Sequence, residues 1–194
     1  MAEDKRIIKT KRNLKRTLTE MLAEEPFEHM TVSELCRRAE TSRITFYTYY
    51  DDKFALVEDM MHDFYAEADQ LYHELQRQNN PEGDGIRGYQ NLLECILGMA
   101  ERHPDFFSHV SAEQNPDLSN AFFKAIYAGV RSYILRHTEQ IRARYSADMI
   151  AALICAGFAG VISVAYLQGT SGISRESLTG MYHDLLESNL FIRE

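Results

Sequence analysis

Side chains able to bind nucleic acid lie close together between residues 43 and 53 of this sequence. They are Arg43, Thr45, Tyr47, Tyr49 and Lys53. An arginine can pair bidentately with guanine, and the methyl group of a threonine can contact that of thymine. Tyrosine hydroxyls suit phosphate oxygens, and phosphate contacts fix the position of a protein on DNA without reading the sequence. This group of residues therefore predicts a DNA-binding surface.

The residues around this group predict two short helices joined by a turn. Thr31 can cap the first helix, and Glu34, three residues later, completes a capping-box pattern. The helical pattern breaks at Thr41, Ser42 can cap the second helix, and Asp52 can cap a third. This is a helix-turn-helix pattern. The alternative is a purely structural pair of packed helices, which would not need polar and aromatic side chains on its exposed side.

Residues 31–56 resemble the DNA-binding domain of the tetracycline-repressor (TetR) family. The matching residues are Thr31, Val32, Leu35, Ala39, Ser42, Thr45, Phe46, Tyr47, Tyr49, Tyr50, Lys53 and Leu56. The aromatic-rich stretch that ends in a lysine, residues 43–53, is the specific part of the match. The periodic segments along the chain predict an all-α fold of about nine helices, and the resemblance agrees with it. Residues 1–53 would form a three-helix DNA-binding domain, and residues 54–194 a larger effector-binding and dimerisation domain.

The resemblance also implies a role for each matching side chain. Arg43 and Thr45 would face base edges in the major groove, while Thr31, Tyr47 and Tyr49 would contact phosphates. The ammonium group of Lys53 would meet a phosphate at a helix start, where backbone amides also help to hold the anion. The complete set of predicted DNA-binding residues is Thr31, Ser42, Arg43, Thr45, Tyr47, Tyr49 and Lys53. Phe46 and Tyr50 are expected to pack inward.

Two residues depart from the family pattern. Glu40 stands at the turn between the helices, where the family usually has glycine. If that position has a positive φ, a residue with a side chain carries local strain there. Ile44 also stands where glycine is common, and it could either face the core or alter base preference. Both departures bear on which DNA sequence is bound, and neither argues against DNA binding.

The net charge of −8 is unevenly distributed along the chain. Residues 1–53 hold 11 of the 21 basic and 10 of the 29 acidic side chains, which leaves 10 basic and 19 acidic side chains in the remainder. Residues 5–16 contain basic side chains and no acidic ones. A locally basic amino-terminal part and an acidic remainder suit a protein that docks one end on DNA. The alternative for residues 5–16 is a solvated helix face.

Every strongly periodic segment elsewhere in the chain favours a helix, and no segment favours a strand convincingly. The expected helices beyond the helix-turn-helix span about residues 4–24, 53–77, 86–102, 116–136, 147–167 and 174–191, with a short one opening at Pro104. Residues 149–167 are the longest apolar stretch. Because Gly157, Gly160 and Ser163 interrupt it, we expect a buried helix rather than a membrane span.

The expected helix at residues 147–167 is apolar on nearly all sides and therefore needs cover. Together with the last helix, it could form a four-helix interface between two copies of the chain, and the TetR resemblance implies the same arrangement. The predicted interface residues are Leu153, Gly157, Gly160, Val164, Leu178, Tyr182 and Leu185. The alternative is that both helices are covered within one monomer.

Aromatic and aliphatic side chains on the middle helices could line an effector pocket. The predicted lining is Tyr89, Leu93, Ile96, Phe106, Phe107, Phe122, Ile126, Tyr127 and Phe158. Binding pockets are mostly apolar with a few polar anchors. The alternative is a filled core, which the sequence does not separate from a pocket. The effector expected from this lining and from the acidic charge is a small apolar or cationic compound.

The sequence contains no enzyme motif and no spacing typical of a metal site, so we expect neither catalysis nor a cofactor. Cys36, Cys95 and Cys155 are widely spaced in apolar surroundings, as in a reduced, cytoplasmic protein. The charged amino terminus does not resemble a secretory leader. The function expected is a transcriptional regulator, usually a repressor, that binds a palindromic operator as a homodimer and is released by an effector. The alternative is a TetR-like interaction protein that acts through a protein partner without operator binding.

Overall fold

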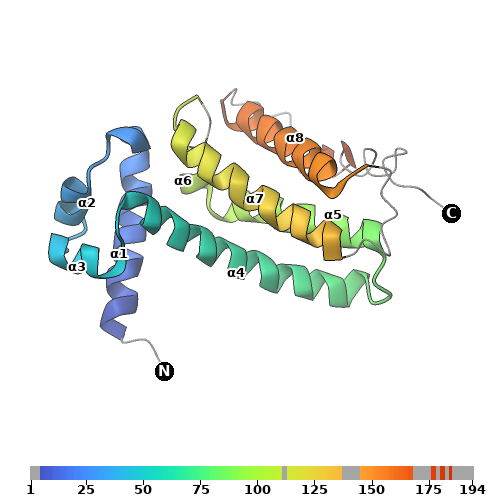
Figure 1. The fold of residues 1–194 in the computed structure, drawn as a ribbon, viewed down its shortest axis with the longest axis horizontal. Helices are drawn as coiled ribbons and strands as arrows, with labels where there is room; N and C mark the ends of the chain where they lie inside the picture. Colours follow the sequence, from blue (N-terminus) through green and yellow to red (C-terminus); the bar gives the residue numbers. More distant parts are fainter. Residues whose placement is uncertain are drawn as a thin grey trace. The chain divides into compact units, whose positions relative to one another are not determined.

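A computed structural model describes residues 5–110, 113–136 and 145–167, together with Glu176, Ser177, Gly180, Met181 and Asp184. Within these residues the chain forms eight α-helices, one short 3-10 helix and no strand, so the predicted all-α fold is confirmed (Figure 1). The elements are α1 (Lys5–Leu22), η1 (Phe27–His29), α2 (Val32–Arg38), α3 (Arg43–Tyr49), α4 (Lys53–Asn79), α5 (Gly85–Arg102), α6 (Pro104–Phe107), α7 (Pro116–Arg136) and α8 (Ala147–Leu167).

The helix ends lie close to those expected from the sequence. α7 and α8 begin and end where the apolar period and the flanking residues predict. α4 continues two residues beyond its expected end, to Asn79. The last expected helix, residues 174–191, falls mostly outside the described residues. None of the helices in the described part of the chain is long and apolar enough to cross a membrane.

The chain divides into two compact units. The first comprises residues 1–64 and 103–122, and the second comprises residues 65–102 and 123–194. α4 and α7 therefore each contribute to both units. The division into functional domains after residue 53 stays a prediction.

The core of the first unit forms around α1. Leu14, Leu18 and Met21 repeat at helical spacing on one face of α1, and all three are fully buried. Phe27 in η1 and Phe46 in α3 are also fully buried. Burying large apolar side chains contributes roughly 1.5–3 kcal/mol for each one. This burial holds helices as short as α2 and α3, which would be marginal in isolation.

Side-chain caps start the short helices of the first unit. Thr31 Oγ1 accepts the backbone N–H of Glu34 at 3.2 Å, and Ser42 Oγ accepts that of Thr45 at 3.0 Å. The Glu34 carboxylate accepts hydrogen bonds from the guanidinium groups of Arg37 and Arg38 on its own helix. The predicted helix starts are confirmed.

The turn between α2 and α3 has Glu40 in the left-handed region, with φ of 50°. The Thr41 N–H donates to the Cys36 carbonyl at 2.9 Å, and the Glu40 N–H donates to the Arg37 carbonyl at 3.3 Å. These two bonds make a Schellman motif, whose left-handed position is usually glycine. Because Ala39 just before it is buried, α2 and α3 pack closely here. Glu40 therefore has the positive φ under which the sequence analysis expected local strain at this turn.

Hydrogen-bonded amides and tyrosine rings join the helices of the second unit. Asn91 in α5 is almost fully buried, and its amide exchanges two hydrogen bonds with that of Asn79 in α4, at 2.8 and 3.0 Å. Tyr133 in α7 packs edge-on against Tyr72 of α4 and Tyr89 of α5. α7 also contacts α8, since Tyr127 Oη donates to Asp148 at 2.9 Å.

Candidate nucleic-acid interface

α3 presents most of its residues to solvent while two aromatic rings hold it in place. Phe46 is fully buried, and Tyr50, just after the helix, is 4% exposed. Their ring centroids lie 5.5 Å apart. Tyr50 Oη also donates to Asp59 of α4 at 2.6 Å, which joins the end of α3 to α4. The expectation that Phe46 and Tyr50 pack inward is confirmed.

The residues predicted to read DNA lie on the exposed side of α3. Arg43 is exposed, and its guanidinium carbon lies 5.9 Å from the ring centroid of Tyr47, which is 48% exposed. Thr45 and Tyr49 are half-buried. The hydroxyls of Thr45 and Ser42 lie 2.8 Å apart. The structure therefore brings these side chains to one short helix, where an arginine and a tyrosine hydroxyl are available to an incoming polyanion.

Thr31 and Lys53 lie at the starts of two other helices. Thr31 is exposed at the start of α2. Lys53 opens α4, and its Nζ donates to the carbonyl oxygens of Phe27, Glu28 and Met30 at 2.6, 3.0 and 3.0 Å. Burial lowers the pKa of Lys53, and the carboxylate of Glu28 opposes this shift. The phosphate contact predicted for Lys53 stays a prediction, and the structure adds the role of holding η1 against α4.

Besides its contacts with Lys53, η1 is held by residues near the start of α7, which the sequence did not reveal. The Phe27 N–H donates to Asn115 Oδ1 at 2.5 Å, and the Asp117 N–H at the start of α7 donates to Glu28 Oε1 at 3.1 Å. Asn115 is almost fully buried, and its amide nitrogen donates to the His109 carbonyl. These partners lie far apart in the sequence, so no local pattern could have indicated them.

Exposed basic side chains on α1 add positive charge to the first unit. Lys5, Lys9 and Arg12 are exposed on this helix. Lys15 is instead committed to α4, where its ammonium lies 3.0 Å from Asp59 and 2.6 Å from Asp63. Part of the basic run therefore has a structural role, and its exposed members remain available for phosphate contacts.

The predicted effector residues are divided between the two units. Phe106, Phe107 and Phe122 belong to the first unit, and all three are buried. Of the second-unit residues, Tyr89, Leu93, Ile96 and Ile126 are buried, and Tyr127 is half-buried. The side chain of Phe158 lies outside the described residues.

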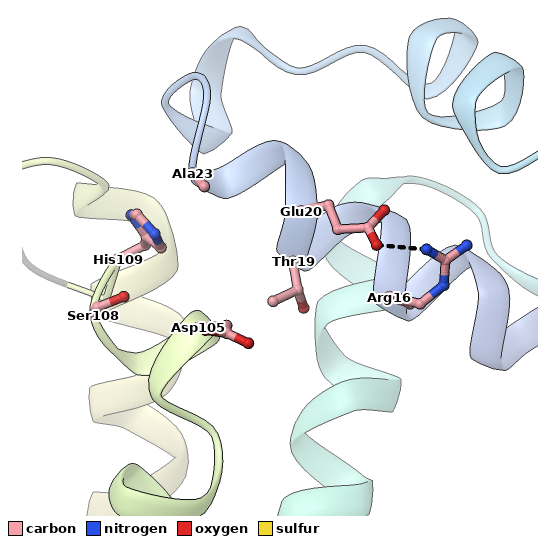
Figure 2. A pocket seen from close by; sticks show the side chains of 7 residues that line it. All are labelled: Arg16, Thr19, Glu20, Ala23, Asp105, Ser108 and His109. Carbon is pink, nitrogen blue, oxygen red and sulfur yellow. Dashed lines mark hydrogen bonds and ion pairs between the residues drawn. The ribbon is translucent and has the colours of Figure 1, made fainter.

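A groove of about 560 Å³ lies in the first unit, and none of the predicted effector residues lines it. It is lined by Arg16, Thr19, Glu20, Ala23, Asp105, Ser108 and His109. Figure 2 shows Thr19 of α1 on the side of Asp105 in α6, while Arg16 and Glu20 point toward one another as an ion pair. This charged lining differs from the mostly apolar lining of typical small-molecule pockets.

The predicted dimer residues Leu153, Gly157 and Gly160 of α8 are exposed. Leu153 is 49% exposed, and Gly157 and Gly160 are exposed on the same helix. A Cβ atom added at Gly160 would meet no atom within 4 Å. Met149 is 61% exposed one turn before Leu153. The side chain of Val164 and the residues Leu178, Tyr182 and Leu185 lie outside the described residues.

The described residues contain no group of three potential metal ligands among histidine, cysteine, aspartate and glutamate. Cys36, Cys95 and Cys155 are buried free thiols. Burial raises the pKa of Cys95 and of Cys155 to about 12, and it also raises that of Cys36. A thiol with a raised pKa is a poor nucleophile at neutral pH.

Comparison with known proteins identifies the amino-terminal part of the chain. Residues 16–60 match the family model of bacterial regulatory proteins of the tetR family. An uncharacterised helix-turn-helix transcriptional regulator, YxbF of Bacillus subtilis (strain 168), is 36% identical over 50 residues, which are 26% of this chain and 13% of that protein. The chain thus matches only a small part of this curated relative.

Solved structures of TetR-family regulators share the fold over nearly the whole chain. A transcriptional regulator of Syntrophomonas wolfei superposes with a TM-score of 0.72 at 13% identity, covering 93% of this chain and 94% of that one. FadR of Thermus thermophilus, a TetR-family repressor in complex with lauroyl-CoA, superposes with a TM-score of 0.59 at 19% identity, covering 95% and 96%. The predicted resemblance is confirmed: the chain has the fold of TetR-family transcriptional regulators, and residues 16–60 carry the amino-terminal domain of that family.

Proposed function

We propose that this chain is a transcriptional regulator that binds a two-fold symmetric operator as a homodimer, with α3 in the major groove. The observation that carries the proposal is the outward side of α3, where exposed Arg43 and Tyr47 lie beside Thr45 on a helix anchored by buried Phe46. Thr31, Ser42, Tyr49 and Lys53 complete the proposed contact set. The exposed basic side chains on α1 favour the approach of the negatively charged DNA.

Selection of bound DNA from a random pool tests this function. Wild-type protein should enrich an inverted repeat whose half-sites lie about one helical turn apart. Arg43→Ala should relax the base preference at one position of each half-site, at a cost of roughly 1–3 kcal/mol for a lost bidentate contact. Arg87→Ala is the matched control, because Arg87 is exposed on α5 in the other unit. Enrichment of no inverted repeat would remove the operator proposal and favour a regulator that acts through a protein partner.

The proposed homodimer forms through the exposed apolar side of α8. Met149, Leu153 and Gly157 lie four residues apart and are all exposed, while Ile150 and Ile154 beside them are buried. An apolar stripe of this kind on a soluble domain is typical of an interaction surface. Placing it against the same stripe of a second copy satisfies two-fold symmetry, since such an interface uses the same patch twice.

Leu153→Arg tests the dimer, because it places an unpaired charge in the proposed interface. Sedimentation should show a monomer that no longer binds the operator cooperatively. Leu135→Arg is the control, since Leu135 on α7 is 45% exposed and Leu153 is 49% exposed. A well-folded wild-type monomer at micromolar concentration would count decisively against the dimer.

We also propose that a small apolar or cationic effector binds the second unit and lowers DNA affinity. Tyr65 Oη is buried there and has no hydrogen-bond partner among the described residues. Burial raises the pKa of Tyr65 to about 12. A buried polar group left unpaired needs an explanation, and a bound ligand would supply its partner. Tyr127 and the buried aliphatic side chains of α5 and α7 would complete the site.

An effector shifts DNA affinity only through its different affinity for the two states of the protein. The expected coupling is roughly 5- to 150-fold, and operator DNA must weaken effector binding by the same factor. A compound screen read by release of labelled operator would find the effector. Tyr65→Phe should weaken the response to the effector and leave unliganded DNA binding unchanged. If no compound releases the operator across a broad screen, the effector proposal fails and a protein partner becomes the better regulator.

A further inference from the structure

Ile44 is the most solvent-exposed large apolar residue in the described part of the chain. Its side chain is 82% exposed, against 61% for Met149, the next highest. Single exposed apolar residues are common on protein surfaces and need no explanation by themselves. Ile44, however, is the second residue of α3, between Arg43 and Thr45. The structure therefore excludes the core position that the sequence left open.

The threonine hydroxyls near Ile44 are engaged within α3 and its cap. Thr48 Oγ1 donates to the Ile44 carbonyl at 2.9 Å. Thr45 Oγ1 pairs with Ser42 Oγ, which also accepts the Thr45 N–H. Thr48 stands one turn after Ile44, so the two side chains share one side of α3. Apolar contact, rather than a new hydrogen bond, is what this part of the helix offers a partner.

We propose that Ile44 is a specificity-determining residue that recognises the 5-methyl group of a thymine in each half-site. This inference rests on the proposed insertion of α3 into the major groove. The thymine methyl is the apolar group that base pairs present there, whereas cytosine presents an amino donor at the neighbouring position. An isoleucine side chain can hydrogen-bond neither the amino group of cytosine nor O4 of thymine, so the methyl group alone separates the two bases. Ile44 thus favours thymine through apolar contact with a methyl group that cytosine lacks.

Replacement of thymine by deoxyuridine tests the proposal directly, because uracil keeps the hydrogen-bonding edge and lacks the methyl group. The operator selected by the wild-type protein would be synthesised with one thymine at a time replaced symmetrically in both half-sites. At one such position, wild-type binding should weaken about fourfold for each half-site, the factor that corresponds to one buried methyl-sized group. Ile44→Ala should bind the thymine and uracil operators equally.

Two further variants identify the side chain responsible. Ile44→Val keeps a branched apolar side chain and should retain most of the thymine preference. Thr45→Ser removes a different methyl group and keeps the hydroxyl, so it should leave the thymine-to-uracil ratio at that position unchanged. Because Ile44 is exposed, thermal unfolding of the Ile44 variants should match that of the wild type.

The outcomes separate this inference from the proposed function. An operator that is bound specifically, yet without thymine preference over uracil at any position, overturns the role of Ile44 and leaves the regulator intact. A preference that survives in Ile44→Ala also overturns it. Failure to select any inverted repeat removes both proposals together.

Discussion

Lys53 contacts Phe27 in two ways. Its Nζ donates to the Phe27 carbonyl at 2.6 Å and lies 4.6 Å from the centroid of the Phe27 ring. A cation over an aromatic face is attracted by the ring quadrupole. The first residue of α4 is thereby joined to η1, which leads into the helix-turn-helix.

Lys53→Met should lower the free energy of unfolding by about 2–3 kcal/mol, because the methionine keeps most of the stem and removes the charged donor. Urea unfolding would measure the loss, with Lys124→Met on exposed Lys124 as the control. A change no larger than that of the control would contradict the structural role. The same variant tests the predicted phosphate contact, since losing one should lower the salt slope of DNA binding by about one unit.

Glu40→Gly should stabilise the protein by about 0.5–1 kcal/mol. A residue with a side chain costs roughly 1–2 kcal/mol in the left-handed conformation, and glycine removes this cost. Part of the gain is lost because glycine has more conformational freedom in the unfolded chain. Glu40→Val should destabilise, because a β-branched residue suits φ of 50° poorly. The urea midpoints of the two variants should move in opposite directions, and a shift in one direction for both would argue against backbone strain.

Gly88→Ala should destabilise the second unit by about 1–3 kcal/mol, as overpacking of a filled core does. A Cβ atom at this position would overlap the hydroxyl of Tyr133, which is 3% exposed and cannot easily move away. Gly98→Ala on the same helix is the control, since the nearest atom would be a flexible Arg102 nitrogen at 3.2 Å. The double variant Gly88→Ala/Tyr133→Phe should recover part of the lost stability, as measured by thermal unfolding. If it recovers none, the Tyr133 hydroxyl is not the obstacle.

The carboxyl of Glu34 should titrate at unusually low pH. Hydrogen bonds from Arg37 and then Arg38 lower the pKa of Glu34 from 4.5 to about 2. A depressed folded-state pKa gives stability that is present above the unfolded value and is lost as the pH falls towards the folded one. The contribution should therefore disappear between about pH 4.5 and 2.

Carboxyl-carbon NMR would follow the Glu34 titration, and Glu34→Gln should remove this part of the acid sensitivity. Salt at 1 M should reduce the effect, because ion pairs at the protein surface are screened by dissolved ions. Glu58→Gln on α4 serves as the control for losing a carboxylate. A Glu34 titration midpoint near 4.5 would contradict the paired geometry.

The sequence predicted the helices well because helix starts and apolar periods follow from local patterns. Thr31 and Ser42 mark helix starts by their own chemistry, and Phe46 is distinguished by its place in a helical period. The bond between Phe27 and Asn115 joins residues 88 positions apart, so nothing local indicated it. The sequence left the orientation of Ile44 open for a related reason. In a helix of only seven residues, one apolar side chain can face either the core or the solvent, and the tertiary packing decides which.

The buried thiols give each unit its own measure of local opening. Cys36 lies in the first unit, and Cys95 and Cys155 lie in the second. Because only the thiolate reacts and burial suppresses it, a thiol reagent can modify each cysteine only when the surrounding core opens. The three modification rates, followed by mass spectrometry, convert into opening free energies in the same way as amide hydrogen exchange. A ligand that stabilises the second unit alone would slow the modification of Cys95 and Cys155 and leave the modification rate of Cys36 unchanged. The three native cysteines can therefore show which unit a bound molecule stabilises.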